Sequence, residues 1–592
     1  MSFTNNVRDH RTHPTRSIAM NYFRSVVFGL LLVLAFNATA FPAESRFIDH
    51  SLLVAPEYPC TWPSYPFPKF QIMHQDKVGP SSPYNVDTLL IDGNTGTQLD
   101  VPPHSVARPE LNREKSGPLG LAYTDRIEPW QFGGEACVID VRDLLDQAPN
   151  GVSPLVKREH VQRFEDRHRQ LRFGDVVLFR SDYSDRYYRP LPAGNRYIVD
   201  ILDRKAPGYP NPDPDCMEFI ATRKVMTLGT DSASMGPLPT LAEPTHYAGL
   251  KHGMIWTESA TNLGDIPSTG AFYCLLGPKH KDGPYGEGRA FSITGGSLPE
   301  RLIDACRNKR AVDLSPTLSA DYPLTDPGVQ TGSHRQAYLK IDFLYAEYLD
   351  LWHHGHLMDS MAGTHLVPPS YSLPPDDKPV QYSPEIRGWL EQYETQYGKR
   401  GSSTMTTEQV PLSWTCGEAR VFDVRFLVGS TPARQWPASP EITVEHIQEF
   451  EAKHGELAAD EILILQTGHI DRHFRSRPND TALWQDPLYG KSEGWPALRA
   501  DAVIYLKSKG IRCVATDAPN LGGVDPRKAL HTYWALGSNN MVGVEYLYNV
   551  GNIPTNQRPY FLFAAVKIRD CHGGPGRAIV LYGNRESSSK TD

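Results

Sequence analysis

An acid and a histidine stand four residues apart in the segment N-T-G-T-Q-L-D-V-P-P-H, which runs from Asn94 to His104. The acid is Asp100, and two prolines separate it from the histidine. A carboxylate can bind a divalent cation, and an imidazole can carry a proton near neutral pH. Because proline fixes its own backbone φ angle, we expect a metal ligand and a proton carrier to share one stiff loop.

The same skeleton recurs with different polar groups in M-A-G-T-H-L-V-P-P-S-Y, from Met361 to Tyr371. Further pairs of similar segments follow in the same order, such as G-E-A-C-V-I-D-V-R with G-E-A-R-V-F-D-V-R. A repeat of about 285 residues indicates a duplicated domain rather than a solenoid. We assign residues 41–310 and 321–592 to the two copies and residues 311–320 to a linker.

Each copy contains the patterns of both strands and helices. Short runs such as V-V-L-F and I-L-I-L are rich in β-branched or aromatic residues and predict strands. The stretch A-L-R-A-D-A-V-I-Y-L-K-S-K-G predicts an amphipathic helix that stops at Gly510. The predicted fold class is therefore mixed α/β, built twice.

The duplicated motif and its downstream segments resemble the cyclase family, which includes bacterial-type kynurenine formamidase and isatin hydrolase. That family carries H-x-G-T-H-x-D-x-P-x-H, then a strand, a G-T-D segment, and a later His and Glu. Corresponding landmarks occur here in order in both copies. The resemblance implies two tandem swivelling β/β/α domains. Since family members work as dimers, it also implies an intrachain pseudo-dimer.

In the first copy, the resemblance places metal ligands at Asp100, His246 and Glu258, and the catalytic histidine at His104. Asn94 and Gln98 replace the two motif histidines. One histidine and two carboxylates suit a single Zn²⁺ or Mn²⁺ ion with an open position for water. Amides bind these metals weakly, so we do not expect a second ion. The alternative is a metal-free polar pocket in which the acid and histidine form hydrogen bonds.

The second copy has lost more of the motif. Met361, Val367 and Tyr371 replace a metal-binding histidine, the bridging acid and the catalytic histidine. The residues left at the ligand positions of this vestigial site are His365, His531 and Glu545. They either hold one metal ion or belong to a scaffold that pairs with the first copy. The tract H-H-G-H, residues 353–356, is a further metal candidate, although a partly buried loop fits it better.

The N-terminus has the layout of a secretory signal. Arg24 precedes an apolar run from Val26 to Phe36, and Ala38-Thr39-Ala40 offers a cleavage site. We interpret residues 1–40 as a signal peptide with an N-terminal extension, the alternative being an uncleaved membrane anchor. The net charge of −8 does not favour nucleic acid or anionic membrane as a partner. We expect the eight cysteines to be mostly free, buried thiols.

These observations lead to two hypotheses about function. The first is an exported metal-dependent hydrolase that cleaves a C–N bond of an amide, a formamide (as an arylformamidase does) or a cyclic amide. Its cofactor would be one Zn or Mn ion, and its substrate a small molecule, such as an aromatic amide. The second is a catalytically degenerate protein that binds a small ligand or is purely structural. Further homo-oligomerisation is open in both.

Overall fold

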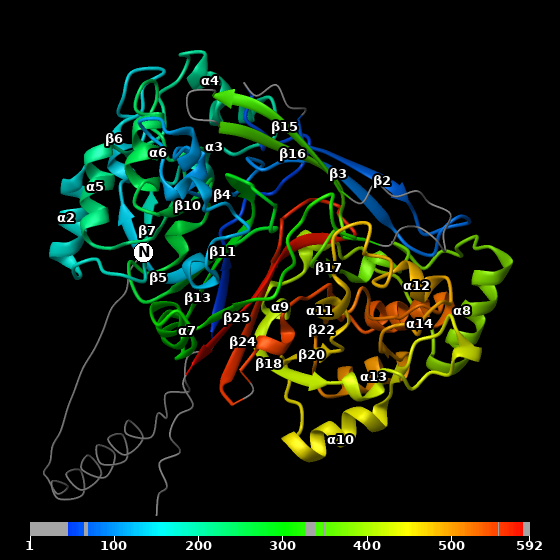
Figure 1. The fold of residues 1–592 in the computed structure, drawn as a ribbon. Helices are drawn as coiled ribbons and strands as arrows, with labels where there is room; N and C mark the ends of the chain where they lie inside the picture. The colour runs from blue at the N-terminus through cyan, green and yellow to red at the C-terminus, as the bar shows by residue number, and fades with distance from the viewer. Residues whose placement is uncertain (1–44, 64–68, 326–337, 347–350, 555, 584–592) are drawn as a thin grey trace, which may run out of the picture.

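The structure is a computed structural model that describes residues 45–63, 69–325, 338–346, 351–554 and 556–583 (Figure 1). The predicted signal segment, residues 1–40, lies outside these ranges. Within them, no helix combines the length and the apolar character that crossing a membrane requires. All eight cysteines are buried and free, as predicted.

A nine-stranded sheet with a parallel centre forms the core of the first half. Successive residues of its strand β7 alternate between two apolar clusters: Val176 and Leu178 belong to one, and Val177 and Phe179 belong to the other. The sheet is therefore buried on both faces, as expected for parallel strands. The parallel strands are β5 (Gly133–Asp140), β7 (Asp175–Arg180), β9 (Thr227–Thr230) and β10 (Ile255–Glu258). The flanking strands are β1 (Arg46–Asp49), β4 (Gln98–Asp100), β11 (Phe272–Leu276), β12 (Tyr285–Glu287) and β13 (Arg289–Thr294). The helices include α2 (Arg158–Arg167), α5 (Pro214–Thr222), α6 (Ala242–Leu250) and α7 (Leu298–Arg307).

The second half repeats this plan with an eight-stranded sheet, in which an extra pairing of β24 with β25 joins strands from its two ends. Its parallel strands are β18 (Cys416–Asp423), β20 (Ile462–Gln466), β22 (Cys513–Thr516) and β23 (Val542–Glu545). The other strands are β14 (Ala311–Asp313), β17 (His365–Val367), β24 (Arg558–Ala565) and β25 (Gly574–Gly583). The helices include α8 (Pro384–Tyr397), α10 (Val444–His454), α13 (Ala500–Ser508) and α14 (Pro526–Ser538). The mixed α/β class is confirmed. The predicted linker is not a free connection, because its first residues form β14 and pair with β25.

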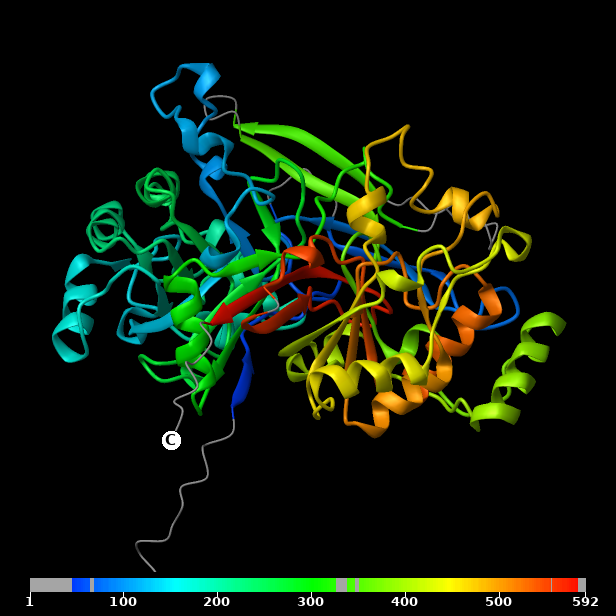
Figure 2. The ribbon, with the colours of Figure 1, turned by 60° about the horizontal axis from the view of Figure 1, so that its bottom comes forward.

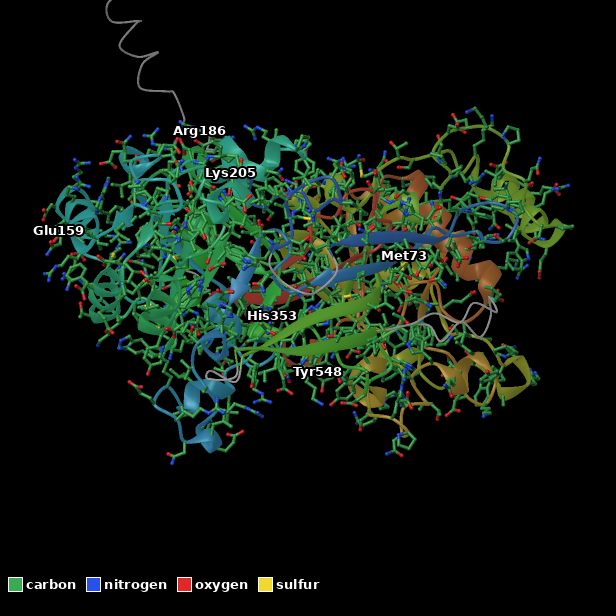
Figure 3. The ribbon with its side chains drawn as sticks, turned by 90° about the horizontal axis from the view of Figure 1, so that it is seen from above. Met73, Glu159, Arg186, Lys205, His353 and Tyr548 are labelled. Atoms are coloured by element: carbon green, nitrogen blue, oxygen red, sulfur yellow. The ribbon has the colours of Figure 1, made fainter. Side chains whose placement is uncertain are left out.

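Each half contributes a β-hairpin to a shared sheet. The first half supplies β2 (Gln71–Asp76) and β3 (Val86–Asp92), and the second supplies β15 (Tyr338–Ala346) and β16 (Leu351–Asp359). The strand order is β15-β16-β3-β2, with β3 antiparallel to β16. Figure 3 shows the blue and green hairpins side by side from above. This pairing ties the halves together directly before each copy of the eleven-residue motif.

The halves also share a hydrophobic core. β24 and β25 of the second half lie between the two halves (Figure 2). Their buried residues Leu562 and Ile579 belong to the same apolar cluster as Phe272 and Phe291 of the first half. Burial of large apolar side chains on both sides is typical of a permanent interface rather than a transient contact. We infer that the two halves fold as one unit.

Two buried polar contacts cross this interface. Arg577 is 1% exposed and donates to Asp313 Oδ2 (2.6 Å) and to the Thr124 carbonyl (2.9 Å). Asp87, whose side chain is fully buried, accepts from the amide of His572 at 2.6 Å and from the ring of His74 at 2.6 Å. The contacts that join one half to the other are Arg577–Thr124 and Asp87–His572.

Replacing Arg577 should destabilise the whole chain. Arg577→Met removes the guanidinium that pairs with the buried Asp313, and breaking a buried pair costs about 3 kcal/mol or more. We expect a fall of that size in the free energy of unfolding, measured by urea denaturation. The exposed Arg425→Met, which breaks a surface pair with Asp423, should cost about 1 kcal/mol or less. Equal effects of the two variants would contradict the structural role of Arg577.

The Asp87 contact should make stability depend on acid pH. Burial alone raises the pKa of Asp87, but hydrogen bonds from His572 and His74 outweigh it and lower the pKa from 3.8 to about 2. The carboxylate therefore stabilises the fold above about pH 4 by about 2 kcal/mol, and this stabilisation is lost as the pH falls towards 2. Urea denaturation of Asp87→Asn should show lower stability at pH 5 and a flatter dependence between pH 5 and pH 3. The exposed control Asp166→Asn should follow the wild-type curve.

Candidate active site

Strands β4 and β10 present four polar side chains on one face of the first sheet. The strands are antiparallel, with Asp100 opposite Trp256 and Gln98 opposite Glu258. Side chains two residues apart on a strand share a face, and so do directly opposed residues on neighbouring strands. The register therefore turns both carboxylates the same way, towards helix α6.

His246 on α6 completes the group. Its Nε2 lies 3.4 Å from Asp100 Oδ2 and 3.3 Å from Glu258 Oε1. Its Nδ1 donates to the carbonyl of Ala242 at 2.7 Å, which fixes the ring and leaves Nε2 for the carboxylates. All three side chains are buried. The three residues that the resemblance assigns as metal ligands thus converge, although they are far apart in the sequence.

Two buried carboxylates at one place require a positive charge between them. Burial alone lowers the pKa of His246, but hydrogen bonds with Asp100 and Glu258 raise it to about 10. Burial, together with the nearby charge of Asp100, raises the pKa of Glu258. The imidazolium proton therefore supplies the positive charge in the metal-free state. A divalent cation on Nε2 would supply two positive charges in place of the one on the imidazolium.

Neutral donors occupy the rest of the site. Gln98 Nε2 donates to Glu258 Oε2 and to Asn94 Oδ1, both at 2.8 Å. The indole N–H of Trp256 lies 3.1 Å from Asp100 Oδ2 and 3.3 Å from Glu258 Oε1. Asn94 and Gln98 stand at the positions of the motif's two histidines. Asp100 Oδ1 is the exception, since it is buried and has no hydrogen-bond partner among the described residues.

His104 lies beside the group at the end of a short 3₁₀ turn, Pro102–His104. Its Nε2 is 3.7 Å from Asp100 Oδ2, and its ring centroid is 5.1 Å from that of His246. Burial, and then the charge of His246, lower the pKa of His104 to about 3, so the ring is neutral at pH 7. The acid, the prolines and the histidine therefore form the compact loop that their spacing predicts.

The second half contributes His353, which the sequence analysis did not assign to this site. The ring of Tyr285 packs edge-on against His104, with centroids 5.3 Å apart, and its hydroxyl forms a hydrogen bond with His353 Nδ1. His353, which is labelled in Figure 3, lies on β16, in the hairpin that the second half adds to the shared sheet. No local pattern marks His353 for this role. Trp256 was also missed, but its place two residues before Glu258 on a strand could have revealed it.

The remaining histidines of the tract at residues 353–356 do not share one site, but His356 lies with His280 and Glu287 in a group whose ligand atoms are within 4.8 Å of one another. His354 Nδ1 contacts Asp342, whereas His356 Nδ1 contacts the hydroxyl of Tyr338 at 2.9 Å. The same hydroxyl contacts His280 Nδ1 at 3.0 Å. Successive residues of a strand point to opposite faces, which separates His353 from His354. The tract is part of β16 rather than a loop.

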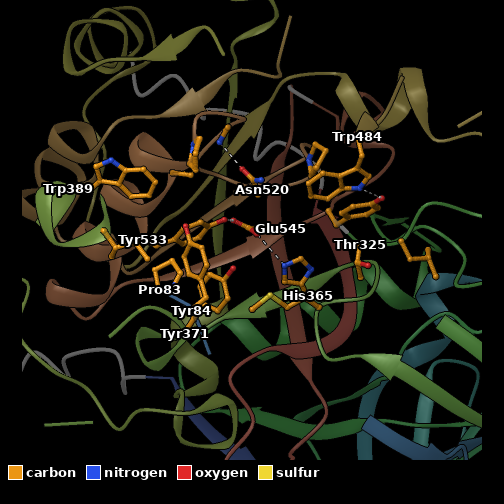
Figure 4. A pocket seen from close by; sticks show the side chains of 18 of the residues that line it. Pro83, Tyr84, Thr325, His365, Tyr371, Trp389, Trp484, Asn520, Tyr533 and Glu545 are labelled. Atoms are coloured by element: carbon orange, nitrogen blue, oxygen red, sulfur yellow. Dashed lines mark hydrogen bonds and ion pairs between the residues drawn. The ribbon is translucent and has the colours of Figure 1, made fainter. Parts of the chain in front are cut away.

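The corresponding place in the second half differs from the prediction. His365 Nε2 lies 3.2 Å from Glu545 Oε2, but His531 points elsewhere, with its Nε2 3.0 Å from the carbonyl of Trp389. Tyr533 takes the expected place, and its hydroxyl donates to Glu545 Oε1 at 2.7 Å (Figure 4). The prediction that His531 belongs to this site was wrong. His531 lies two positions before Tyr533 on helix α14, and two positions along a helix turn the side chain by about 200°.

Comparison with known proteins gives the family. A model of the putative cyclase family matches residues 37–237 and 312–522. Isatin hydrolase of Roseibium aggregatum is 30% identical over 206 residues, which cover 34% of this chain and 71% of that protein.

A crystal structure of an isatin hydrolase bound to the product analogue thioisatinate is 17% identical, with a TM-score of 0.36, over 46% of this chain and 98% of the other. Isatin hydrolase A from Ralstonia solanacearum is 22% identical, with a TM-score of 0.36, over 48% and 100%. A potential metal-dependent hydrolase with cyclase activity is 15% identical, with a TM-score of 0.29, over 42% and 100%. Because the family model matches two successive regions that together span more than half of the sequence, the chain belongs to the putative cyclase family as two tandem copies.

Proposed function

We propose that this chain is a metal-dependent hydrolase that opens a C–N bond of an amide, formamide or cyclic amide at the first-half site. The observation that carries the proposal is the convergence of Asp100, His246 and Glu258 beside His104. The 30% identity to isatin hydrolase supports a small aromatic cyclic amide as substrate. The predicted signal peptide supports an exported enzyme.

The separations of His246 from the two carboxylates suit one divalent ion. Tetrahedral ligands at about 2.0–2.1 Å from a metal stand roughly 3.3 Å from each other. His246 Nε2 lies at this separation from one oxygen of each carboxylate, and the unpartnered Asp100 Oδ1 offers a further acceptor. Bound there, a divalent ion would polarise the substrate carbonyl and activate water. The amides of Asn94 and Gln98 support one ion rather than two.

The chain's own residues supply proton transfer and positioning. His104 Nε2 lies 3.7 Å from Asp100 Oδ2, so its ring is placed to accept a proton from water and to return it to the departing nitrogen. Tyr285 packs against that ring, and His353 holds the Tyr285 hydroxyl. A base held in one orientation needs less reorganisation during the reaction. The second half therefore takes part in positioning the base of the first.

A second candidate is a small-ligand-binding protein that has lost catalysis. It is favoured by the hydrogen bonds that Gln98 and Trp256 donate to the two carboxylates, because these partly satisfy the site without a metal. Metal content separates the two candidates.

Metal analysis of the purified protein should find about one Zn or Mn per chain, the number that three ligands at one place support. Asp100→Ala should abolish this content and lower kcat/KM for isatin or N-formylkynurenine by about 10³-fold or more. His365→Ala in the second half is the matched control and should leave the metal content unchanged. A protein that stays metal-free after incubation with both ions would overturn the proposal and favour the second candidate.

The positioning role of His353 can be tested separately. His353→Ala frees the Tyr285 hydroxyl and should lower kcat by about tenfold, because His104 loses its fixed orientation. The metal content should not change, since His353 touches none of the proposed ligands. His353→Gln, which restores a hydrogen-bonding group, should recover part of the rate. Loss of metal in His353→Ala would contradict a positioning role.

A further inference from the structure

A cavity of about 370 Å³ lies in the second half, at the place equivalent to the first-half site. Such a volume is within the range of small-molecule sites. Its walls are predominantly aromatic and apolar (Figure 4). The aromatic wall residues are Tyr84, Tyr371, Trp389, Trp484, Tyr533 and Tyr546.

The cavity results from replacement of the family's polar groups. Tyr371 stands where the first half has His104, and Tyr533 stands where it has His246, twelve residues before the glutamate in both halves. Val367 replaces the bridging acid. The second half thus lacks the ligands for a hydrolytic metal but keeps a cavity. One buried carboxylate, Glu545, remains in its wall.

The two halves build the aromatic wall together. Tyr84 of the first half stacks on Tyr371 of the second, with centroids 4.7 Å apart and an interplanar angle of 13°. Tyr533 meets both rings edge-on, at 5.8 Å and 5.1 Å. The neighbouring Asn85 fixes the stack. Its backbone N–H donates to the Tyr371 carbonyl and its side-chain Nδ2 donates to the Ser370 carbonyl, both at 2.7 Å. The rings are therefore held in place before any ligand binds.

The charges around the cavity favour a cation. Glu545 and the exposed Glu385 line it, whereas no lysine or arginine is among its described lining residues. His365 Nδ1 lies 2.8 Å from the Gly363 carbonyl, and its Nε2 lies 3.2 Å from Glu545. Both ring nitrogens thus face protein acceptors, and Glu545 Oε1 also accepts from the Leu521 amide and the Tyr533 hydroxyl, both at 2.7 Å. Glu385 is therefore the carboxylate left to attract a ligand cation. Aromatic faces carry a negative electrostatic potential and attract ammonium groups.

We propose that this cavity is a non-catalytic binding site for a small organic ammonium compound that carries an aromatic ring. The ring fills the apolar part of the cavity, and the ammonium group lies against the tyrosine faces near the acidic side chains. This inference does not depend on the proposed hydrolase function, because it uses the other half's site.

Isothermal titration calorimetry of the full chain with three compounds of similar shape tests the ligand class. The compounds are phenethylamine (a cation), 2-phenylethanol (neutral) and phenylacetate (an anion). We expect one phenethylamine per chain, bound about tenfold more tightly than 2-phenylethanol, because a desolvated cation–π contact favours the cation. Phenylacetate should not bind measurably. Equal binding of all three compounds, a preference for phenylacetate, or no binding of phenethylamine at millimolar concentration would each overturn the proposal.

Variants then locate the site. Tyr371→Leu keeps an apolar wall but removes an aromatic face, and should weaken phenethylamine binding about tenfold. Glu385→Gln is at an exposed position, which does not endanger folding, and should weaken binding about twofold to threefold. Asp100→Ala in the first half is the matched control and should bind phenethylamine as the wild type does. Loss of binding in Asp100→Ala with full binding in Glu385→Gln would place the ligand in the first half and contradict the proposal.

Discussion

The pairing of β3 with β16 is the constraint on which both sites depend. Each strand runs directly into a copy of the eleven-residue motif, so their register places both motif loops at once. The β15–β16 hairpin of the second half brings His353 to the first site, and the segment before β3 brings Tyr84 to the second. Because one chain carries both halves, the partner's effective concentration is always high. Neither site is complete within its own half.

The two sites show how buried charge limits what substitution can do. The first keeps two carboxylates and therefore needs a cation, which is a proton on His246 or a metal ion. The second has lost one carboxylate at Val367 and the matching imidazole at Tyr533. The glutamate that remains, Glu545, has His365 Nε2 at 3.2 Å and the Tyr533 hydroxyl at 2.7 Å as partners.

Burial also explains why the first site tolerates its missing histidines. Gln98 and Trp256 donate hydrogen bonds to Asp100 and Glu258, so the carboxylates stay oriented without a second cation. A neutral donor satisfies a lone pair but adds no charge, which leaves His246 as the centre of positive charge. The site is therefore arranged for one cation, with His104 neutral beside it.

The sequence by itself determined the duplication, the mixed α/β class, and the loop that joins Asp100 to His104. These features depend on spacing within a short segment or on a repeated order of segments, which are visible without coordinates. The same kind of reasoning would have found Tyr533, since His246 and Tyr533 both lie twelve residues before a glutamate. Only the tertiary structure decided the roles of His353 and Tyr84. Their contacts join strands and halves that are distant along the chain, and local sequence does not encode which distant side chain fills a given space.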